Sequence, residues 1–211
     1  MSSNRRPTRL LASELACIRG GRTVFSGLSF AVDAGEALLV SGPNGAGKSS
    51  LLRAVAGLVR LTDGRLELAD GDADATLGEQ AHYLGHQDAL KPSLSVAENL
   101  EFWSRYLDGG AAIAHLETAA LDAVGLGSIA GLPAAYLSAG QRRRLSIARL
   151  IAVERPLWLL DEPTSALDAA AQTMLATLMR SHLAGGGMIL AATHGPVGLD
   201  GAKELRLGGG R

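Results

Sequence analysis

The segment 42-GPNGAGKS-49 constrains the fold of this chain more than any other stretch of its sequence. It has the spacing G-x-x-x-x-G-K-[ST], it follows the short apolar run EALLVSG, and it precedes SSLLRAVAGL, whose apolar residues have helical spacing. A strand, a glycine-rich turn and a helix in this order are typical of a phosphate-binding loop. Successive glycines let backbone N–H groups converge on phosphate oxygens, and the helix adds the positive end of its dipole.

The same segment predicts how a nucleotide is held. Lys48 is expected against the β and γ phosphates, and the Ser49 hydroxyl is expected to coordinate Mg²⁺. A glycine-rich turn without a ligand is the alternative, and it is disfavoured because the elements on both sides match the motif. The predicted nucleotide-binding residues of the loop are Gly42, Pro43, Asn44, Gly45, Ala46, Gly47, Lys48, Ser49 and Ser50.

Two adjacent carboxylates follow a second apolar run, 157-LWLLDEP-163. This run predicts a buried strand with Asp161 at its carboxyl end, where the ligands of open α/β sheets bind. Asp161 is predicted to hold Mg²⁺ through water, and Glu162 to orient and deprotonate the attacking water. A solvated acidic turn is the alternative, and the phosphate loop in the same chain makes it the weaker one.

Apolar runs rich in Val, Leu and Ile alternate with helical patterns, which predicts an α/β domain with a largely parallel sheet. Ser95 followed by Glu98 is a capping-box pattern at the start of a helix. The region from about 88 to 140 is helical and is predicted to be a subdomain inserted in a single domain of residues 1–211. Strands are expected at 10–18, 27–35, 36–42, 65–68, 82–86, 156–162, 188–194 and 202–207, and helices at 49–58, 95–107, 111–124, after 138, and at 169–182.

Composition limits the classes of protein to which the chain can belong. Its 211 residues, 47% hydrophobic and 19% charged, fit one globular domain, and a net charge of -1 argues against a basic nucleic-acid binder. The lone Cys17 excludes an intramolecular disulfide and is expected to be a small core residue. The N-terminus lacks the apolar segment of a secretory signal, and no apolar run approaches the ~20 residues of a membrane span. If the protein serves a membrane process, another chain is expected to supply the spans.

The remaining motifs together resemble those of the ATP-binding subunits of ABC transporters. The segments 136-YLSAGQRRR-144, 161-DEPTSALD-168 and 193-TH-194, with Gln87, follow the order and approximate spacing of that family, and the resemblance extends from about Leu10 to Leu207. It implies a P-loop NTPase (RecA-like) core with a mostly parallel sheet, an antiparallel β subdomain and an inserted α-helical subdomain. It also implies ATP and Mg²⁺ as ligands, with ATP hydrolysis coupled to transport.

The resemblance implies roles for residues outside the phosphate loop. Phe25 lies where the family has an aromatic residue that stacks on adenine, and a plain core phenylalanine is the alternative. Gln87 matches the glutamine that touches Mg²⁺ or the attacking water. His194 matches the histidine that contacts the γ phosphate, with an ordinary surface histidine as the alternative. Asp168 matches the acid of a loop that crosses between two subunits.

Ser138, Gly140 and Gln141 match the signature motif of the family. There the motif starts a helix whose N-terminus faces the γ phosphate held by a second copy, so the resemblance implies a head-to-tail dimer that buries two ATP molecules. A helix N-terminus with free N–H groups and a serine hydroxyl is a natural anion site. Ala139 stands where most members have glycine, and its methyl group restricts the backbone. We interpret alanine at this position as tolerated.

Three consecutive arginines, Arg142, Arg143 and Arg144, follow the signature residues. They lie in the first turns of the expected helix, where the positive end of the dipole disfavours them. The anionic surroundings of the nucleotide, the carboxylates of the helical subdomain and a solvated basic face remain as alternatives for what they contact.

The segment 83-YLGHQDALKPSLSVAENLEFW-103 is similar to that of the haem-exporter ATPases of the bacterial cytochrome c maturation system. In that subgroup GHQ takes the glutamine position and an aromatic pair follows ENL; Trp158 and the arginine-rich helix fit it as well. The resemblance implies a peripheral subunit on the cytoplasmic face of the bacterial inner membrane, partnered by separate transmembrane permease subunits and not by nucleic acid. His82 and His86 flank a predicted strand instead of sharing a helix face, which disfavours haem ligation by this pair.

Three other functions stay open at this point. The chain resembles, less closely, the ATPase subunits of other small ABC exporters or importers. A soluble ABC-type ATPase acting on ribosomes or DNA is disfavoured, because such proteins carry fused cassettes, a coiled-coil insertion or basic extensions. A regulatory module without hydrolysis is disfavoured because Lys48, Asp161, Glu162 and His194 are all present.

Overall fold

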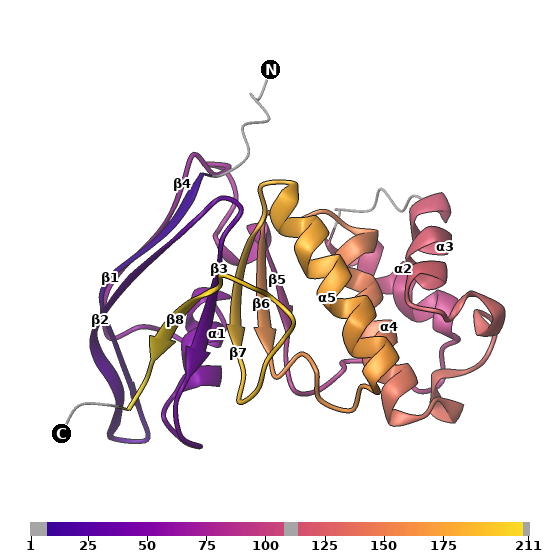
Figure 1. The fold of residues 1–211 in the computed structure, drawn as a ribbon, viewed down its shortest axis with the longest axis horizontal. Coiled ribbons are helices and arrows are strands. Elements are labelled where there is room, and N and C mark those ends of the chain that lie inside the picture. Colours follow the sequence, from indigo (N-terminus) through magenta and orange to yellow (C-terminus); the bar gives the residue numbers. More distant parts are fainter. Residues whose placement is uncertain (1–7, 108–113, 209–211) are drawn as a thin grey trace. The chain divides into compact units, whose positions relative to one another are not determined.

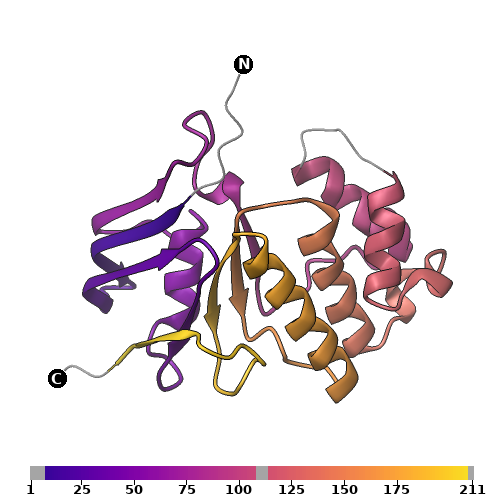
Figure 2. The ribbon, with the colours of Figure 1, turned by 45° about the horizontal axis from the view of Figure 1, so that its top comes forward.

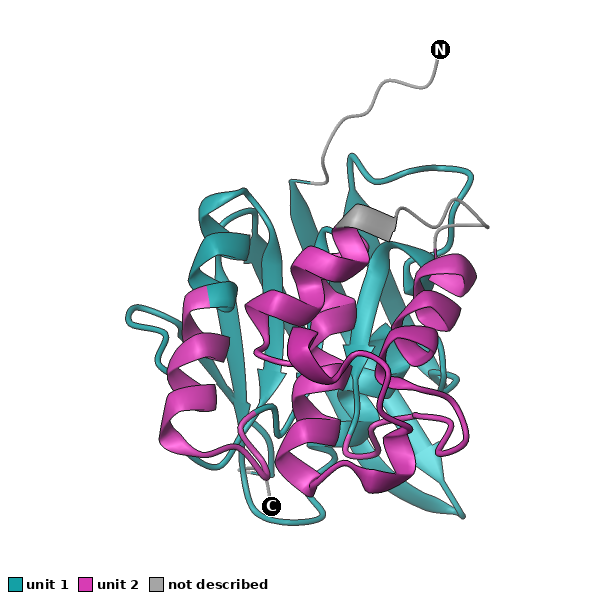
Figure 3. Cartoon of the chain, turned by 90° about the vertical axis from the view of Figure 1, so that its right-hand side faces the viewer, with its two compact units in different colours: residues 1–85, 155–163, 178–211 teal, residues 86–154, 164–177 magenta. Residues whose placement is uncertain are grey.

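The structure is a computed structural model that describes residues 8–107 and 114–208. Strands and helices alternate along much of the chain, as the sequence predicts (Figure 1). Two compact units are present, and Figure 3 gives each its own colour. Among the described residues, unit 1 covers 8–85, 155–163 and 178–208, and unit 2 covers 86–107, 114–154 and 164–177.

A five-stranded parallel sheet forms the centre of unit 1. Its order is β5-β6-β7-β3-β8, and every neighbouring pair is parallel. The strands β6 and β7 are buried along their whole length, as expected for central strands covered on both faces. Because parallel strands end at the same edge, the turns after β3, β6 and β7 open on one side. The strands are β3 (Ala37–Ser41), β5 (Ala81–Leu84), β6 (Leu157–Asp161), β7 (Met188–Ala192) and β8 (Lys203–Arg206).

The first two strands and β4 form an antiparallel sheet, also in unit 1. Strands β1 (Arg9–Arg19), β2 (Arg22–Asp33) and β4 (Asp63–Ala69) pair in the order β2-β1-β4. The predicted start of the second strand at residue 27 is wrong. Gly20 and Gly21 both have positive φ, as in the two-residue hairpin turns whose twist matches that of the flanking strands. The two strands therefore pair directly beside the turn, with Arg19 opposite Arg22.

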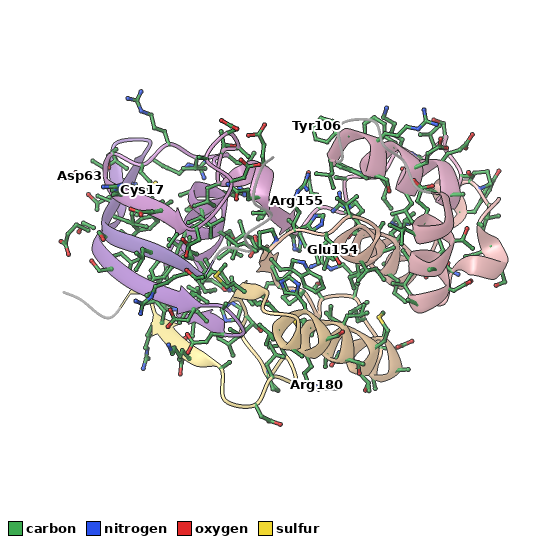
Figure 4. All side chains as sticks on the ribbon, turned by 90° about the horizontal axis from the view of Figure 1, so that it is seen from above. Cys17, Asp63, Tyr106, Glu154, Arg155 and Arg180 are labelled. Atoms are coloured by element: carbon green, nitrogen blue, oxygen red, sulfur yellow. The ribbon has the colours of Figure 1, made fainter. Side chains whose placement is uncertain are left out.

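Helix α1 (Lys48–Val55) lies beside the parallel sheet, on the side of the antiparallel sheet, as Figures 1 and 2 both show. Its residues Leu51, Leu52 and Val55 join a hydrophobic core to which strands of both sheets contribute. Cys17, labelled in Figure 4, is a free, buried member of this core, which confirms the prediction for it. The core fixes α1 against β6 and β7, and so fixes the loop that precedes the helix.

Unit 2 is mostly helical, and three helices among its described residues pack against one another. They are α2 (Val96–Leu107), α3 (Ala114–Ala123) and α4 (Ala139–Ala152), with short 3-10 turns at Gly127–Ile129 and Ala134–Tyr136. The predicted subdomain of about 88–140 lies inside this unit, while residues 111–113 of the predicted second helix fall outside the described residues. Helix α5 (Ala169–Ala184) begins in unit 2 and ends in unit 1.

The capping box predicted at the start of α2 is present. The Ser95 N–H donates to Glu98 Oε2 at 2.7 Å, and the Glu98 N–H donates to Ser95 Oγ at 3.2 Å. At the other end of this helix, Tyr106 is exposed, as Figure 4 shows. Within the described ranges, the structure contains no helix with the length and apolar character needed to cross a membrane.

The strand before Gln87 is shorter than predicted. Strand β5 ends at Leu84, and a 3-10 turn (Gly78–Gln80) precedes it. His82 lies inside the strand and is buried, instead of flanking it, whereas His86 is exposed beyond its end. The expected geometry of this histidine pair is therefore corrected: one belongs to the sheet interior and the other to the turn.

Candidate functional site

The glycine-rich loop joins β3 to α1, as the motif predicts. Gly47 is the N-cap of α1 with φ 100°, and no side chain caps this helix end, so its first N–H groups stay open to an anion. A Cβ on Gly47 would lie 2.6 Å from Val24 Cγ1, so both the backbone angle and the available space demand glycine there.

Lys48 bends back over the loop to which it belongs. Its Nζ donates to the carbonyl oxygens of Gly42 at 2.8 Å and Pro43 at 3.2 Å, and lies 3.0 Å from Nε2 of His194. The side chain is nearly buried, so its charge acts in surroundings of lower dielectric constant than water. The loop itself therefore positions a cation beside the open N-terminus of α1.

Asp161 ends strand β6 and is almost fully buried, and Ser49 Oγ donates to its Oδ1 at 2.9 Å. A serine hydroxyl and a carboxylate are oxygen ligands of the kind that Mg²⁺ prefers, with water and phosphate completing its coordination. The residues that the structure brings together here fit the ion that the sequence predicts.

Tyr83, on β5, approaches the same carboxylate from the other side. Its hydroxyl lies 3.4 Å from Asp161 Oδ2 and accepts a hydrogen bond from Arg53 Nε at 3.1 Å. Burial raises the pKa of the Tyr83 phenol above its ordinary value, although the bond from Arg53 acts in the opposite direction. The phenol is therefore protonated at neutral pH and donates to Asp161. Neither Tyr83 nor Arg53 was among the residues predicted for this site.

Glu162 follows Asp161 in a strained backbone conformation. Its φ of 47° lies in the left-handed region, which costs a non-glycine residue on the order of 1–2 kcal/mol. The N–H of Glu162 donates to the carbonyl of Ala192 at 2.9 Å, which ties this turn to the end of β7. The Oε1 atom of Glu162 lies 3.7 Å from Nε2 of His194. The same imidazole nitrogen lies 3.0 Å from Lys48 Nζ, so His194 lies beside both charged groups.

Lys48, Ser49, Asp161, Glu162 and His194 line one open cleft of about 690 Å³, all of it within unit 1. One part of the lining is the phosphate loop with Asp161, Glu162 and His194, and another part comes from the turn between β1 and β2. The lining residues are Arg19, Gly20, Val24, Asn44, Gly45, Gly47, Lys48, Ser49, Ser50, Asp161, Glu162 and His194.

Phe25 does not line this cleft. It pairs with Cys17 across β1 and β2, is 8% exposed and packs in the core, as in the alternative interpretation of this residue. Because successive side chains of a strand face opposite sides, its neighbour Val24 faces the cleft instead. The interpretation of Phe25 as an adenine platform is therefore corrected. Sequence reasoning missed Arg19 and Val24, and a correctly placed start of β2 would have indicated Val24.

In unit 2, the signature residues start helix α4 as predicted. Ser138 is the N-cap: its Oγ accepts from the Gln141 N–H at 3.2 Å, while Gln141 Oε1 accepts from the Ser138 N–H at 2.8 Å. A Cβ on Gly140 would lie 3.1 Å from the carbonyl oxygen of Ala166, so the loop before α5 packs closely here. Asp168 Oδ1 accepts from the Ala171 N–H at 2.8 Å and thereby caps α5.

The three consecutive arginines near the start of α4 have different partners within unit 2. Arg143 is buried and lies 3.5 Å from Oδ1 of Asp88. A carboxylate of the helical region was one of the alternatives for what these arginines contact. Arg142 donates to the carbonyl of Leu137, and Arg144 donates to that of Val124 at 2.9 Å. Ser146 Oγ also donates to the backbone of Asp88, the residue after the exposed Gln87. The start of α4 thus holds the segment that follows Gln87.

Known proteins resemble this chain in both sequence and fold. The profile of the ABC transporter family matches residues 25–165. "Cytochrome c biogenesis ATP-binding export protein CcmA" of Rhodopseudomonas palustris (strain BisB18) is 66% identical over 201 residues, which cover 95% of this chain and 98% of the relative. The protein of that name from Nitrobacter winogradskyi is 62% identical with the same coverage of both chains.

Solved structures resemble the whole fold. A "Putative ABC transporter (ATP-binding protein)" from Pyrococcus furiosus has a TM-score of 0.80 at 18% identity, over 95% of this chain and 98% of that one, and at this identity it bears on the fold alone. A "Structure of ATP binding subunit of ABC transporter" has a TM-score of 0.82 at 26% identity, over 95% of this chain and 86% of that one. The chain therefore belongs to the ABC transporter family, among its ATP-binding subunits and beside the cytochrome c biogenesis export proteins.

Proposed function

We propose that the chain is the ATP-hydrolysing subunit of an ABC transporter complex of the cytochrome c maturation type, and that it drives the export or handling of haem. One observation carries the ATPase part: Lys48, Ser49, Asp161, Glu162 and His194 surround a single cleft at the carboxyl edge of a parallel sheet. The near full-length identity to relatives named for cytochrome c biogenesis and export supports the assignment to that system.

The geometry supports a division of labour among these residues. Lys48 and the N-terminus of α1 neutralise the negative charge of the phosphates. Ser49 and Asp161 would hold Mg²⁺, together with Gln87, and the ion would supply positive charge to the β and γ phosphates. Glu162 accepts the proton of the water whose oxygen attacks the γ phosphorus, and ADP leaves. His194 donates a hydrogen bond to the γ phosphate.

A second copy of the chain completes the reaction in this proposal. Ser138, Gly140 and Gln141 meet the γ phosphate bound by the partner copy, and Asp168 lies at the interface. The hydroxyl of Ser138 supports this role. Its oxygen accepts a hydrogen bond from the Gln141 N–H, and its O–H can therefore donate to an anion. Separate transmembrane permease subunits are the other partners. The proposed location is the cytoplasmic face of the bacterial inner membrane, and nucleic acid is no partner.

The substitution Glu162→Gln tests the chemistry. Hydrolysis is expected to fall by about 10²–10⁴-fold, because the amide cannot accept the proton, while ATP binding is retained and ATP traps a dimer. Hydrolysis is measured as phosphate release and dimerisation by size-exclusion chromatography. Glu67→Gln, on the exposed β4 strand, is the matched control and should behave like the parent.

Two results would contradict the proposal separately. A Glu162→Gln variant that hydrolyses ATP at the parent rate would show that Glu162 is not the base. Capture of the chain from membranes tests the transport system: co-purification with the membrane proteins of cytochrome c maturation is expected. Stable association with an unrelated permease would assign the chain to another exporter or importer.

A further inference from the structure

Tyr83, on β5, connects two parts of the nucleotide site in unit 1. Its hydroxyl lies 3.4 Å from Asp161 Oδ2, and Arg53 Nε donates to it at 3.1 Å. Arg53 belongs to α1, the helix that follows the phosphate loop, whereas Asp161 ends β6. One phenol therefore joins the predicted metal-holding carboxylate to the helix that carries Lys48 and Ser49.

The ring of Tyr83 lies close against Gly85. A Cβ on Gly85 would stand 3.0 to 3.2 Å from Cε1, Oη and Cζ of the tyrosine, which is closer than side chains normally approach. The backbone of Gly85 does not have a positive φ, so the ring, and not the backbone angle, is what disfavours a larger residue. The Gly85 backbone thus helps to confine the phenol on one side, two residues before Gln87.

The two oxygens of Asp161 meet different donors. Oδ1 accepts from Ser49, a residue that is itself predicted to coordinate Mg²⁺, and Oδ2 faces the tyrosine hydroxyl. A serine that coordinates an ion through an oxygen lone pair keeps its proton and can still donate to Asp161, so Ser49 and Tyr83 can hold the two carboxylate oxygens at the same time. Arg53 occupies a lone pair of the phenol oxygen and so directs the phenolic proton toward the carboxylate.

We propose that Tyr83 is a positioning residue of the ATPase site, which orients the Asp161 carboxylate for Mg²⁺ through its hydroxyl. Hydrogen bonds from outside the ligand shell commonly fix the plane and basicity of a metal-holding carboxylate, and their loss typically costs about 10–100-fold in metal affinity or activity. This inference rests on the proposed function, since it presumes an ATPase that uses the ion.

The substitution Tyr83→Phe removes the hydroxyl and keeps the ring on Gly85. The free Mg²⁺ concentration for half-maximal hydrolysis is expected to rise about tenfold, at the low end of that range because the bond is long. The ATP affinity measured without Mg²⁺ by equilibrium dialysis should stay within about twofold of the parent. In a second experiment, Mg²⁺ is titrated into the Glu162→Gln variant with and without Tyr83→Phe. The increase in ATP affinity with Mg²⁺ is then measured without hydrolysis. Tyr106→Phe, 71% exposed and outside the cleft, is the matched control.

The outcomes separate the inference from the proposed function. A parent chain without Mg²⁺-dependent hydrolysis, alone or with its membrane subunits, would overturn both. A normal parent with an unchanged Mg²⁺ requirement in Tyr83→Phe would overturn the inference alone. A variant that loses Mg²⁺-free ATP affinity and thermal stability together would also overturn it, because the hydroxyl would then be a structural element.

The role of Arg53 gives an independent check through a double-mutant cycle. If Arg53 acts through the phenol, Arg53→Gln raises the Mg²⁺ requirement less than Tyr83→Phe does and adds nothing further in the double variant. Fully additive effects of the two substitutions would contradict the connection from α1 through Tyr83 to Asp161.

Discussion

The two units hold their functional side chains in different ways. In unit 1, groups from separate elements bond to one another where strands end: Lys48 with His194, and Ser49 with Asp161. In unit 2, Ser138 and Gln141 bond to each other within one helical turn. The first arrangement needs the whole sheet to be folded, whereas the second is a local capping box.

This difference bears on what each unit does alone. The cleft of unit 1 brings together a cation, an open helix N-terminus and a hydroxyl–carboxylate pair, and we propose that these groups bind the nucleotide of one chain. The start of α4 offers an anion one O–H group and helix N–H groups, while the guanidinium of Arg143 lies against Asp88 and that of Arg142 donates to the Leu137 carbonyl. We therefore expect unit 1 residues to govern ATP binding by one chain, and the α4 start to govern hydrolysis in a dimer.

Among the variants that compare the two units, Ser138→Arg is expected to have the largest effect. The new side chain obstructs the face that we propose meets the partner's γ phosphate, so hydrolysis should fall at least about hundredfold, the cost of losing one donor to a transition-state oxyanion. ATP binding by the single chain should not change. Phosphate release and equilibrium dialysis on the same preparation measure the two quantities.

Ser95→Arg is the matched control for this experiment. Ser95 caps α2 with Glu98 just as Ser138 caps α4 with Gln141, so both variants lose a capping box, worth about 1 kcal/mol of stability. Equal losses of hydrolysis in the two variants would show that only helix stability matters. Loss of ATP binding by monomeric Ser138→Arg would contradict a site shared by two chains.

A smaller effect, on binding, is expected for Lys48→Ala. A hydrogen bond from a charged group contributes about 1.5–3 kcal/mol, so the ATP affinity of the single chain should fall by roughly ten- to hundredfold. Lys203→Ala, which removes an exposed lysine paired with Glu36, should leave the affinity unchanged. If both variants bind ATP like the parent, the phosphates do not lie where the loop predicts.

Local chemistry explains which features the sequence predicted correctly. The phosphate loop and the capping box of Ser95 and Glu98 depend on a few neighbouring residues with fixed spacing, and both are present. The C-terminal position of Asp161 on β6 also followed from a short, uninterrupted apolar run. These features can be predicted from the sequence because they depend on neighbouring residues and not on tertiary packing.

Features that depend on contacts distant in sequence were not predicted. Nothing in the letters DEP indicates that Glu162 takes a φ of 47°, because its N–H is bound by Ala192 of another strand. Tyr83 is 78 residues from Asp161, and only the register of β5 on β6 brings them together. Phe25 was misplaced because the glycine turn, and not the apolar run, sets the start of β2.

The corrected position of Phe25 leads to the smallest predicted effect. Arg19 lines the cleft on the side of Val24, and a guanidinium plane can stack on a nucleotide base for about 0.5–1 kcal/mol at an exposed site. Arg19→Ala should therefore weaken ATP binding roughly two- to fivefold without changing the melting temperature. Phe25→Leu should do the reverse: it lowers the free energy of unfolding by about 1 kcal/mol, because the residue is in the core, and leaves the affinity unchanged. If Phe25→Leu loses affinity while Arg19→Ala does not, Phe25 leaves the core to meet the base, and the position of the nucleotide at this end of the cleft must be reassigned.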